Sequence, residues 1–210
     1  MQRLRITFAK TAAMQYTGHL DLHKTWERTF RRARLPLAYS EGFNPHPKIQ
    51  LGAALPLGFT SDCELVDVWL ESPQDVAAAR AALEGAAPPG LHPSDLREVA
   101  ARDPALQTQI TAAEYRVTLP ATVSAAELDE RVRALLAAPE IRRTRREKEY
   151  DLRPLVEALA HTASNEDRHT LVMRLAAREG ATGRPEEVVE ALGWPATTAT
   201  YHRQKLLIRE

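Results

Sequence analysis

The chain has 210 residues, of which 44% are hydrophobic and 27% are charged, and its 28 Lys and Arg residues balance its 28 Asp and Glu residues. This composition is typical of a globular protein, and no apolar stretch approaches the ~20 residues that a membrane helix requires. Because Arg3, Arg5 and Lys10 interrupt the N-terminus, it lacks the apolar core of a signal peptide. We expect a cytoplasmic protein without a membrane partner.

Charge is spread unevenly along the chain. Residues 1–50 hold nine Lys and Arg and three Asp and Glu, whereas residues 51–100 hold two and eight. Either the first segment forms a basic face, or the two segments neutralise each other across the fold. The single cysteine, Cys63, excludes an internal disulfide, a multi-cysteine zinc site and an iron–sulfur cluster held by several cysteines of this chain.

The first half of the chain predicts elements in the order β-α-β-β-α-β. Residues 2–8 alternate polar and apolar side chains, as a half-buried strand does. The helix that follows carries an apolar stripe, is capped by Thr17 or Gly18, and ends at Pro36. The other elements expected in this half are strands over 49–55, 64–70 and 96–100 and a helix from Ser72 to about Leu83.

The second half nearly repeats this order. Ser124 is followed three residues later by Glu127, a capping-box pattern that predicts a helix to about Leu136. Residues 141–148 indicate an exposed basic strand, and a short helix is expected within 150–160. The other elements expected in this half are strands over 113–119, 169–176 and 198–208 and a helix over 185–192.

These elements predict an α+β fold with two ferredoxin-like halves, each of the βαββαβ type, packed together. The first half covers residues 1–104 and the second covers 105–210, with the join near Arg102-Asp103-Pro104. The basic strand and the string Asp151-Leu152-Arg153-Pro154 both fall in the second half.

The run Tyr39-Ser40-Glu41-Gly42-Phe43-Asn44-Pro45-His46-Pro47-Lys48 combines turn residues with the side chains of a binding or catalytic site. Pro45 and Pro47 restrict the backbone on both sides of His46, so the imidazole projects from a stiffened segment. The alternative is a connecting loop with an exposed histidine. Together with the second-half string, this run supplies the candidate substrate-binding residues, which are Tyr39, Ser40, Glu41, Asn44, His46, Lys48, Asp151 and Arg153. For Asp151 and Arg153, a structural ion pair or cap is the alternative.

Two basic segments are candidates for contacts to nucleic acid. One is the first helix and the other is the strand over 141–148, where charge can equally serve to protect an exposed edge. The candidate nucleic-acid-binding residues are Arg28, Arg31, Arg32, Arg142, Arg143, Arg145, Arg146 and Lys148. Tyr39, Phe43 and Tyr150 could add stacking surfaces, although the aromatic signature of an RRM is absent.

His19 and His23 share a face of the first helix. No HExxH pattern and no acidic third ligand accompany them, so we expect no metal site and interpret them as an extension of the apolar stripe. A histidine near a helix N-terminus has its cationic form disfavoured, which suits His19 to a neutral acid–base or hydrogen-bonding role. His19 and His46 are the candidate catalytic residues.

The N-terminal strings Gly18-His19-Leu20-Asp21-Leu22 and Leu35-Pro36-Leu37-Ala38, the run from Tyr39 to Lys48, and Leu55-Pro56-Leu57-Gly58 together resemble the radical-SAM-associated family. The match continues through Asp151-Leu152-Arg153-Pro154 to Arg184-Pro185-Glu186-Glu187. This domain of uncharacterised function occurs at the C-terminus of cobalamin-binding-type radical SAM proteins, or as a separate small protein encoded beside one. The resemblance implies a radical SAM partner that carries an iron–sulfur cluster, S-adenosylmethionine and cobalamin, and no cofactor bound by this chain.

Two functions follow as expectations. The first is a non-catalytic accessory or substrate-binding partner of a radical SAM enzyme, acting on RNA or a ribosome-related macromolecule. The second is a metal-independent RNA-processing endonuclease with a histidine general base, suggested by the similar arrangement of paired ferredoxin-like halves in CRISPR-type RNA endonucleases.

Overall fold

The computed structural model describes residues 1–145 and 147–209. The chain divides into two compact units, Met1–Ile110 (unit 1) and Thr111–Glu210 (unit 2). Unit 1 ends at Ile110, whereas the sequence analysis places the join near Pro104. Each unit combines helices with a mostly antiparallel sheet, so the fold is mixed α/β. No helix in the described part of the chain is long and apolar enough to cross a membrane.

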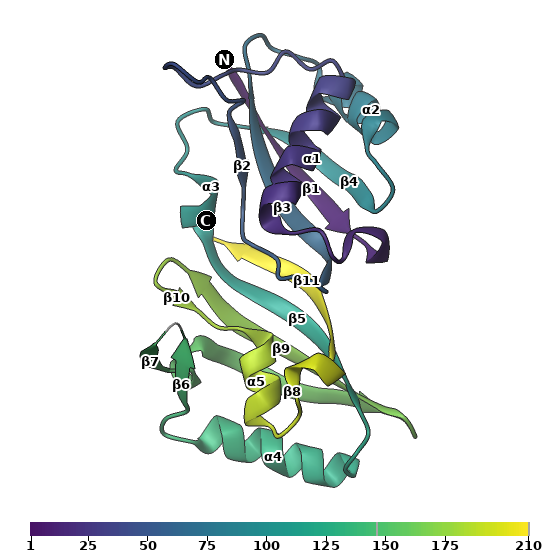
Figure 1. Cartoon of the computed structure of the whole chain (residues 1–210), viewed down its shortest axis with the longest axis vertical. Coiled ribbons are helices and arrows are strands. Elements are labelled where there is room, and N and C mark those ends of the chain that lie inside the picture. Colours follow the sequence, from purple (N-terminus) through teal and green to yellow (C-terminus); the bar gives the residue numbers. More distant parts are fainter. Residues whose placement is uncertain (146, 210) are drawn as a thin grey trace. The chain divides into compact units, whose positions relative to one another are not determined.

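Unit 1 is built on an antiparallel sheet with its two longer helices over one face (Figure 1). The strands lie in the order β2-β3-β1-β4. The elements of this unit are β1 (Gln2–Lys10), η1 (Ala12–Met14), α1 (His19–Arg32), β2 (Ile49–Leu51), β3 (Thr60–Leu70), α2 (Val76–Ala86), β4 (Leu91–Val99) and α3 (Leu106–Gln109). Apart from the short helices η1 and α3, this is the β-α-β-β-α-β order that the sequence predicts.

The core of unit 1 forms where the apolar stripe of α1 meets the apolar face of the sheet. Leu22, Trp26 and Phe30 are buried on α1. The Trp26 ring stacks on Phe30 at 5.0 Å between centroids and meets the edge of Phe8 at 4.9 Å. Rings at these separations add attraction beyond the area that they bury. This packing explains why the spacing of apolar residues predicts α1 correctly.

Two helix ends in unit 1 differ from the prediction. α1 ends at Arg32 rather than near Pro36, because Arg34 takes a left-handed backbone with φ 56°. α2 begins at Val76 rather than after Ser72, because the Asp75 carboxylate accepts a hydrogen bond from the Ala78 N–H at 2.8 Å. An N-cap aspartate satisfies a backbone donor that would otherwise lack a helical partner.

The other face of the unit 1 sheet is charged and buried. Arg3 and Arg5 alternate with the apolar residues of β1, and both guanidinium groups bind the Asp67 carboxylate of β3. The closest approaches are 2.6 Å for Arg3 and 2.8 Å for Arg5, and the three side chains are at most 4% exposed. Other N–H groups of the two arginines donate to the segment that covers this face. Arg3 donates to the carbonyls of Asp103 and Pro104, and Arg5 to the side chain of Gln109.

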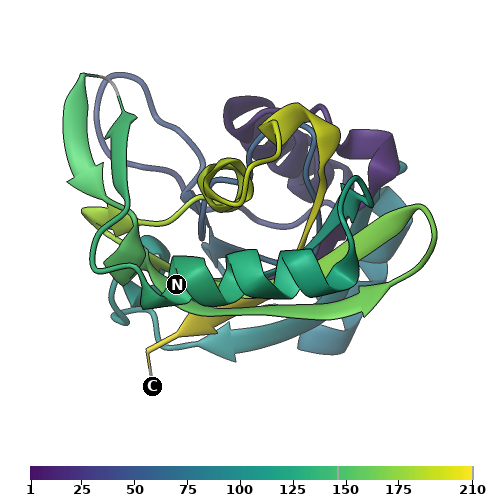
Figure 2. The ribbon, with the colours of Figure 1, turned by 90° about the horizontal axis from the view of Figure 1, so that it is seen from below.

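Unit 2 has an antiparallel sheet in the order β8-β9-β5-β11, with β10 also paired to β9. In Figure 2 the helix α4 lies lengthwise against this sheet, and the β6–β7 hairpin stands apart from it. The elements are β5 (Ile110–Pro120), α4 (Ala125–Ala137), β6 (Arg142–Arg145), β7 (Lys148–Asp151), η2 (Arg153–Leu155), β8 (Val156–Ser164), β9 (Arg168–Arg178), β10 (Ala181–Thr182), α5 (Pro185–Ala191), η3 (Ala196–Thr198) and β11 (Thr200–Ile208).

Two predictions in unit 2 are wrong. The single basic strand expected over 141–148 is instead β6, the first strand of a hairpin with β7. The helix expected within 150–160 is only the short turn η2, after which the chain enters strand β8. β8 pairs along its length with β9, and this pairing overrides the local helical preference of residues such as Leu155, Glu157 and Ala158. Ser124 is confirmed as the N-cap of α4, since its hydroxyl accepts from the Glu127 N–H at 3.2 Å, whereas the Glu127 carboxylate binds Arg131 at 2.7 Å.

The buried cluster on β1 and β3 gives a stability prediction. We expect Asp67→Asn to lower the free energy of unfolding by about 3–5 kcal/mol, because two buried guanidinium groups then lose the carboxylate that both of them bind. Urea unfolding followed by circular dichroism measures this, with the exposed Asp95→Asn of the same unit as control. Equal stability of the two variants would contradict the prediction.

Candidate functional site

Hydrogen bonds between Ser40 and His46 hold the two arms of the motif loop, residues 39–48, together. We call this part of the loop its neck. The Ser40 N–H donates to the His46 carbonyl at 2.8 Å, and the His46 N–H donates to the Ser40 hydroxyl at 3.0 Å. At the base of the loop, the Lys48 N–H donates to the Ala38 carbonyl and the Trp69 N–H donates to the Lys48 carbonyl. Four backbone amides therefore fix the positions of His46 and Lys48 relative to strand β3.

The tip of the motif loop projects from this neck. Gly42 has φ 123°, a backbone conformation that other residues rarely adopt, although a Cβ here would meet no atom within 4 Å. The glycine is therefore required by the turn and not by crowding. Phe43 beside it is fully exposed, and Glu41 and Asn44 are also exposed. The tip thus presents an aromatic ring and two polar side chains to solvent.

A cavity of about 330 Å³ opens at the neck of the motif loop. It combines an indole ring, an imidazole, an ammonium group and a hydroxyl, and its lining residues are Ser40, His46, Pro47, Lys48, Ile49, Gln50 and Trp69. Of the predicted substrate-binding residues, the structure brings Ser40, His46 and Lys48 together here. Glu41 and Asn44 at the loop tip do not line it, and neither does Tyr39.

Trp69, like Ile49 and Gln50, lines this cavity although the sequence analysis does not name it as a site residue. It follows Asp67 on the charged face of β3, and the Arg3 guanidinium lies 4.6 Å from its ring centroid. The signal was present in the sequence, because Val66, Val68 and Leu70 are apolar and strand residues between them must face the other side. An aromatic residue on a face otherwise occupied by charged side chains is a candidate binding residue.

His19 and His46 lie in different parts of unit 1. His19 begins α1 whereas the motif loop follows its end, and a helix of this length separates its ends by about 20 Å. Burial, followed by the neighbouring His23, lowers the pKa of His19 below its ordinary value of 6.5, and Glu64 opposes this shift. His19 is therefore neutral at pH 7. No group of three or more His, Cys, Asp or Glu side chains that could hold a metal ion occurs among the described residues.

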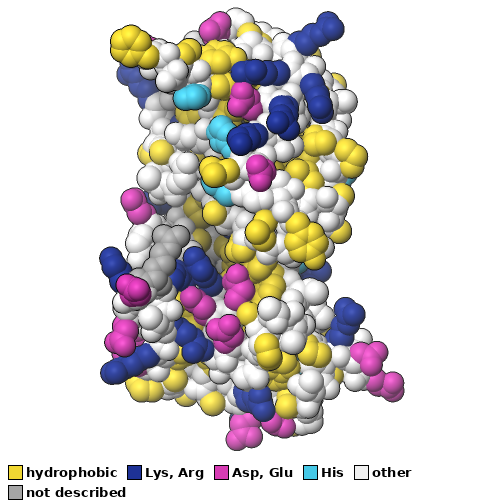
Figure 3. All heavy atoms as spheres, in the orientation of Figure 1, with side chains coloured by type: hydrophobic (Ala, Val, Ile, Leu, Met, Phe, Trp, Pro, Cys, Tyr) yellow, Lys and Arg dark blue, Asp and Glu magenta, His cyan; other side chains and the backbone are white. Residues whose placement is uncertain are grey.

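The arginines of α1 form an exposed basic surface, which is visible as dark blue side chains over this helix in Figure 3. Arg28 and Arg32 are exposed, and so is Arg31, which pairs with Glu27 at 2.8 Å and reaches the Tyr39 hydroxyl at 3.5 Å. This last contact joins the basic surface to the base of the motif loop.

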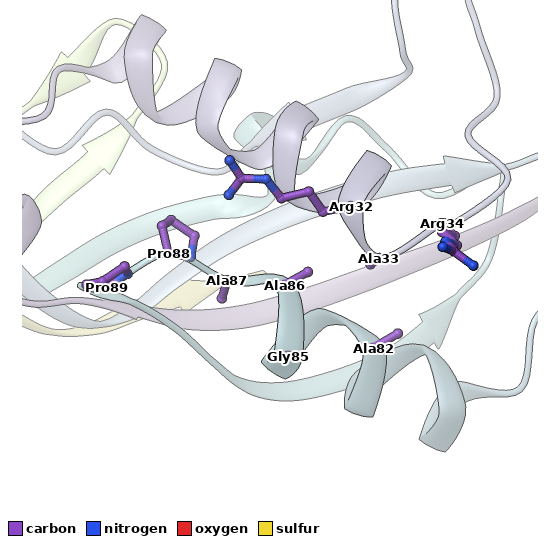
Figure 4. A pocket seen from close by; sticks show the side chains of 9 residues that line it. All are labelled: Arg32, Ala33, Arg34, Ala82, Gly85, Ala86, Ala87, Pro88 and Pro89. Atoms are coloured by element: carbon purple, nitrogen blue, oxygen red, sulfur yellow. The ribbon is translucent and has the colours of Figure 1, made fainter.

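A groove of about 610 Å³ lies at the ends of α1 and α2. Alanine, glycine and proline form most of its walls, and Figure 4 shows Arg32 reaching toward Pro88 while Arg34 lies beyond Ala33. Within the described part of the chain, neither guanidinium group makes a side-chain hydrogen bond or ion pair. The groove therefore offers two cationic groups to an anionic ligand. We call it the arginine groove.

The predicted site residues of unit 2 are held by contacts within that unit. The Asp151 carboxylate accepts from the backbone N–H groups of Ile141 and Arg153 at 2.8 and 2.9 Å. The Arg153 side chain donates to the carbonyls of Leu136 and Val156, both at 3.0 Å. These bonds tie the end of α4 to the start of β8, which is the capping role that the sequence analysis gave as the alternative.

The basic hairpin is partly neutralised. Arg145 binds the Glu187 carboxylate at 2.8 Å and the Tyr150 hydroxyl at 2.9 Å, and Arg143 donates to the Glu187 carbonyl. Burial, followed by Glu187, raises the pKa of Tyr150 to about 12. The other predicted nucleic-acid-binding residues here are Arg142, which pairs with Glu140, Lys148, which is exposed, and Arg146, which lies outside the described residues.

Comparison with solved structures finds a similar fold in a chain of a Cbf5-Nop10-Gar1 complex, with a TM-score of 0.55, 10% identity, and coverage of 97% of this chain and 48% of that chain. A chain of an H/ACA RNP bound to a substrate RNA containing 2'-deoxyuridine matches with a TM-score of 0.47, 10% identity, and coverage of 88% of this chain and 43% of that chain. A chain of the archaeal box H/ACA sRNP Nop10-Cbf5 complex matches with a TM-score of 0.44, 12% identity, and coverage of 90% of this chain and 45% of that chain. The chain thus spans about half the length of these neighbours. With the first of them it shares the fold alone.

No curated protein matches the chain. Residues 3–185 match the family model described as "Uncharacterized protein conserved in bacteria (DUF2344)". Because this match spans most of the 210 residues, the chain belongs to that family. The family description names neither a reaction nor a radical SAM partner.

The environment of His19 gives a titration prediction. We expect its NMR titration midpoint to lie below 6.5, and His23→Gln to raise it, because the positive charge of His23 disfavours a second imidazolium beside it. Since the folded-state pKa is lowered, the contribution of His19 to stability is present above pH 6.5 and is lost as the pH falls through the folded-state pKa. A midpoint at or above 6.5 in the wild type would contradict this account.

Proposed function

We propose that this chain is a cytoplasmic, non-catalytic substrate-binding partner of a radical SAM enzyme, and that its substrate is RNA bound at the motif-loop cavity. The observation that carries the choice of substrate is the grouping of Trp69, Lys48, His46 and Ser40 around one cavity of about 330 Å³. Small-molecule and nucleotide sites are concave and combine an apolar surface with a few convergent polar groups.

The cavity residues match the groups that a single-stranded RNA presents. An indole ring stacks on an unpaired base of any identity, and an ammonium group binds a phosphate. The imidazole of His46 and the hydroxyl of Ser40 add hydrogen-bonding groups for a base edge or a 2'-hydroxyl. Tyr39 and the fully exposed Phe43 supply further stacking surfaces on the motif loop.

The basic surface of α1 supports a path for the phosphate backbone. Its exposed arginines reach the motif loop through Arg31 and Tyr39, and its far side borders the arginine groove. Neutralisation of successive phosphates by such side chains supplies most of the sequence-independent affinity for nucleic acid. Arg3, Arg5 and Lys10 are buried, and the first two bind Asp67 of the acidic segment, so the basic face on unit 1 depends on the exposed arginines of α1 and not on the whole charge excess of residues 1–50.

The radical SAM partner is supported by the resemblance of the motif run and its flanking strings to the radical-SAM-associated family. Cys63 is the single cysteine, so the iron–sulfur cluster, S-adenosylmethionine and cobalamin belong to the partner in this proposal. The similarity to a chain of a Cbf5-Nop10-Gar1 complex, itself an assembly of several proteins, supports a role within an assembly.

We further propose that each unit is ferredoxin-like. The orders β2-β3-β1-β4 and β8-β9-β5-β11 give equivalent positions to the four main strands of each unit, which supports this assignment. In unit 2 the β6–β7 hairpin is then an insertion between the first helix and the second main strand.

The endonuclease alternative receives less support from the geometry. A histidine general base requires cations that stabilise the phosphorane-like transition state near it. The groups that influence His19 are His23 and Glu64, and His46 lies beyond the opposite end of α1. His46 does share a cavity with Lys48, but that grouping suits binding as well as catalysis.

RNA binding at the cavity is testable with a fluorescently labelled 12-nucleotide single strand and anisotropy measurements. We expect Trp69→Ala to raise the Kd roughly 5- to 150-fold, because one stacked base is worth ~1–3 kcal/mol. Lys48→Ala should reduce the slope of log K against log salt by about one. The control is Lys205→Ala, which removes the same charge from an exposed position of unit 2. Equal affinities for wild type and Trp69→Ala would contradict the proposed site.

The partner is testable by affinity capture from native lysate with a tagged full-length chain, followed by mass spectrometry of proteins and sequencing of RNA. We expect the wild type to retain a protein with a cysteine-ligated radical SAM cluster together with RNA, and His46→Ala/Lys48→Ala to retain the protein but lose the RNA. Recovery of cleaved RNA without such a protein would instead support the endonuclease.

A further inference from the structure

A chain of four side chains in unit 2 resembles the hydrogen-bonded core of a serine hydrolase. Asp129 of α4 lies 2.8 Å from Nδ1 of His161, and Nε2 of His161 lies 2.7 Å from the Ser164 hydroxyl, both on β8. The same hydroxyl lies 2.6 Å from Nδ1 of His169 on β9, whose Nε2 lies 2.9 Å from the Val123 carbonyl. A nucleophile, a base within hydrogen-bond reach and a group that orients the base are the features of an activated serine.

An irregularity in strand pairing produces this arrangement. Residues three apart on a regular strand face opposite sides of a sheet, so His161 and Ser164 would point apart. The pairing of β8 with β9 shifts register between His161 and Ala163, and such a bulge re-aims the side chains that follow it. Ser164 is then paired directly with His169, and the two imidazole rings meet edge to face at 5.3 Å.

The hydrogen-bond partners indicate how the hydroxyl could be activated. Three groups along the chain of contacts can only accept: the Val123 carbonyl, the Asp129 carboxylate and the Ala163 carbonyl, which lies 3.1 Å from Nε2 of His161. The Val123 carbonyl holds a proton on Nε2 of His169, which leaves the lone pair on its Nδ1 facing the Ser164 hydroxyl. The Asp129 carboxylate holds a proton on Nδ1 of His161, and in the neutral ring the lone pair on Nε2 faces the same hydroxyl, which is its nearer neighbour at 2.7 Å.

The site is open to small molecules. Ser164 is exposed, and Asp129 is 55% exposed, whereas the side chain of His161 is 8% exposed and therefore held in place. His169 is buried. The residue that carries the hydroxyl is thus exposed, while His161 is held in place by Asp129.

We propose that Ser164 is a nucleophile that accepts an acyl group from activated esters, with His161 as general base and Asp129 as a positioning residue. The Ser164 oxygen forms a bond to the ester carbonyl carbon, and its proton passes to Nε2 of His161. The bond from that carbon to the leaving-group oxygen then breaks. The leaving group departs as an alcohol or phenol that takes the proton from Nε2 of His161, or as a phenolate that leaves the proton there. The products are an acylated Ser164 and the free leaving group. This activity rests on residues of unit 2 alone and does not depend on RNA binding.

The test is the reaction of the full chain with p-nitrophenyl acetate. Release of p-nitrophenolate is followed by absorbance, and peptide mass spectrometry locates the acetyl group. We expect Ser164 to be acetylated at least roughly 100-fold faster than exposed Ser94, because a positioned base contributes about 10²–10⁴-fold. Ser164→Ala should abolish the fast phase of release, whereas Ser94→Ala should leave it unchanged.

A substitution of Asp129 is expected to disturb folding least, because this residue is exposed on α4. We expect Asp129→Asn to slow acetylation of Ser164 at least tenfold with an unchanged circular dichroism spectrum, and Asp129→Glu to restore part of the rate. Two results would overturn the proposal: acetylation of Ser164 no faster than of Ser94 in the folded wild type, or an unchanged Ser164 rate in folded Asp129→Asn.

Discussion

The charged face of unit 1 depends on one buried interaction, the binding of Arg3 and Arg5 to Asp67. Two guanidinium groups and one carboxylate leave a net positive charge away from water, which is tolerated only where each remaining donor finds an acceptor. The carbonyls of Asp103 and Pro104 supply such acceptors. The cluster therefore fixes which side of the sheet receives α1 and α2, and it holds the segment after β4, with α3, against the other side.

The candidate site follows from this cluster. Trp69 lies two residues beyond Asp67 on the same face of β3, with the Arg3 guanidinium against its ring, so its orientation is set by the ion cluster rather than by the motif loop. The loop contributes His46 and Lys48 through backbone hydrogen bonds to the same strand. The candidate binding groups, which come from separate parts of the sequence, thus meet on hydrogen-bonded elements, which is the condition for a preorganised site.

The sequence was sufficient to predict a helix or strand where local signals and tertiary packing agree. The apolar stripe of α1 and the capping box of Ser124 each predict an element that the structure confirms. The sequence was insufficient where pairing with another strand decides the secondary structure. Residues 156–164 are the example, because they form strand β8 by pairing with β9. The motif loop could be singled out from its composition, but its contact with Trp69 could not, because the pairing of β2 and β3 creates it.

Ultraviolet crosslinking of bound single-stranded RNA, followed by mass spectrometry of the crosslinked peptides, tests the central claim most directly. The account predicts crosslinks at the two segments that line the motif-loop cavity, residues 40–50 and the end of β3 with Trp69. Crosslinks confined to other parts of the chain under conditions where RNA is bound would contradict it.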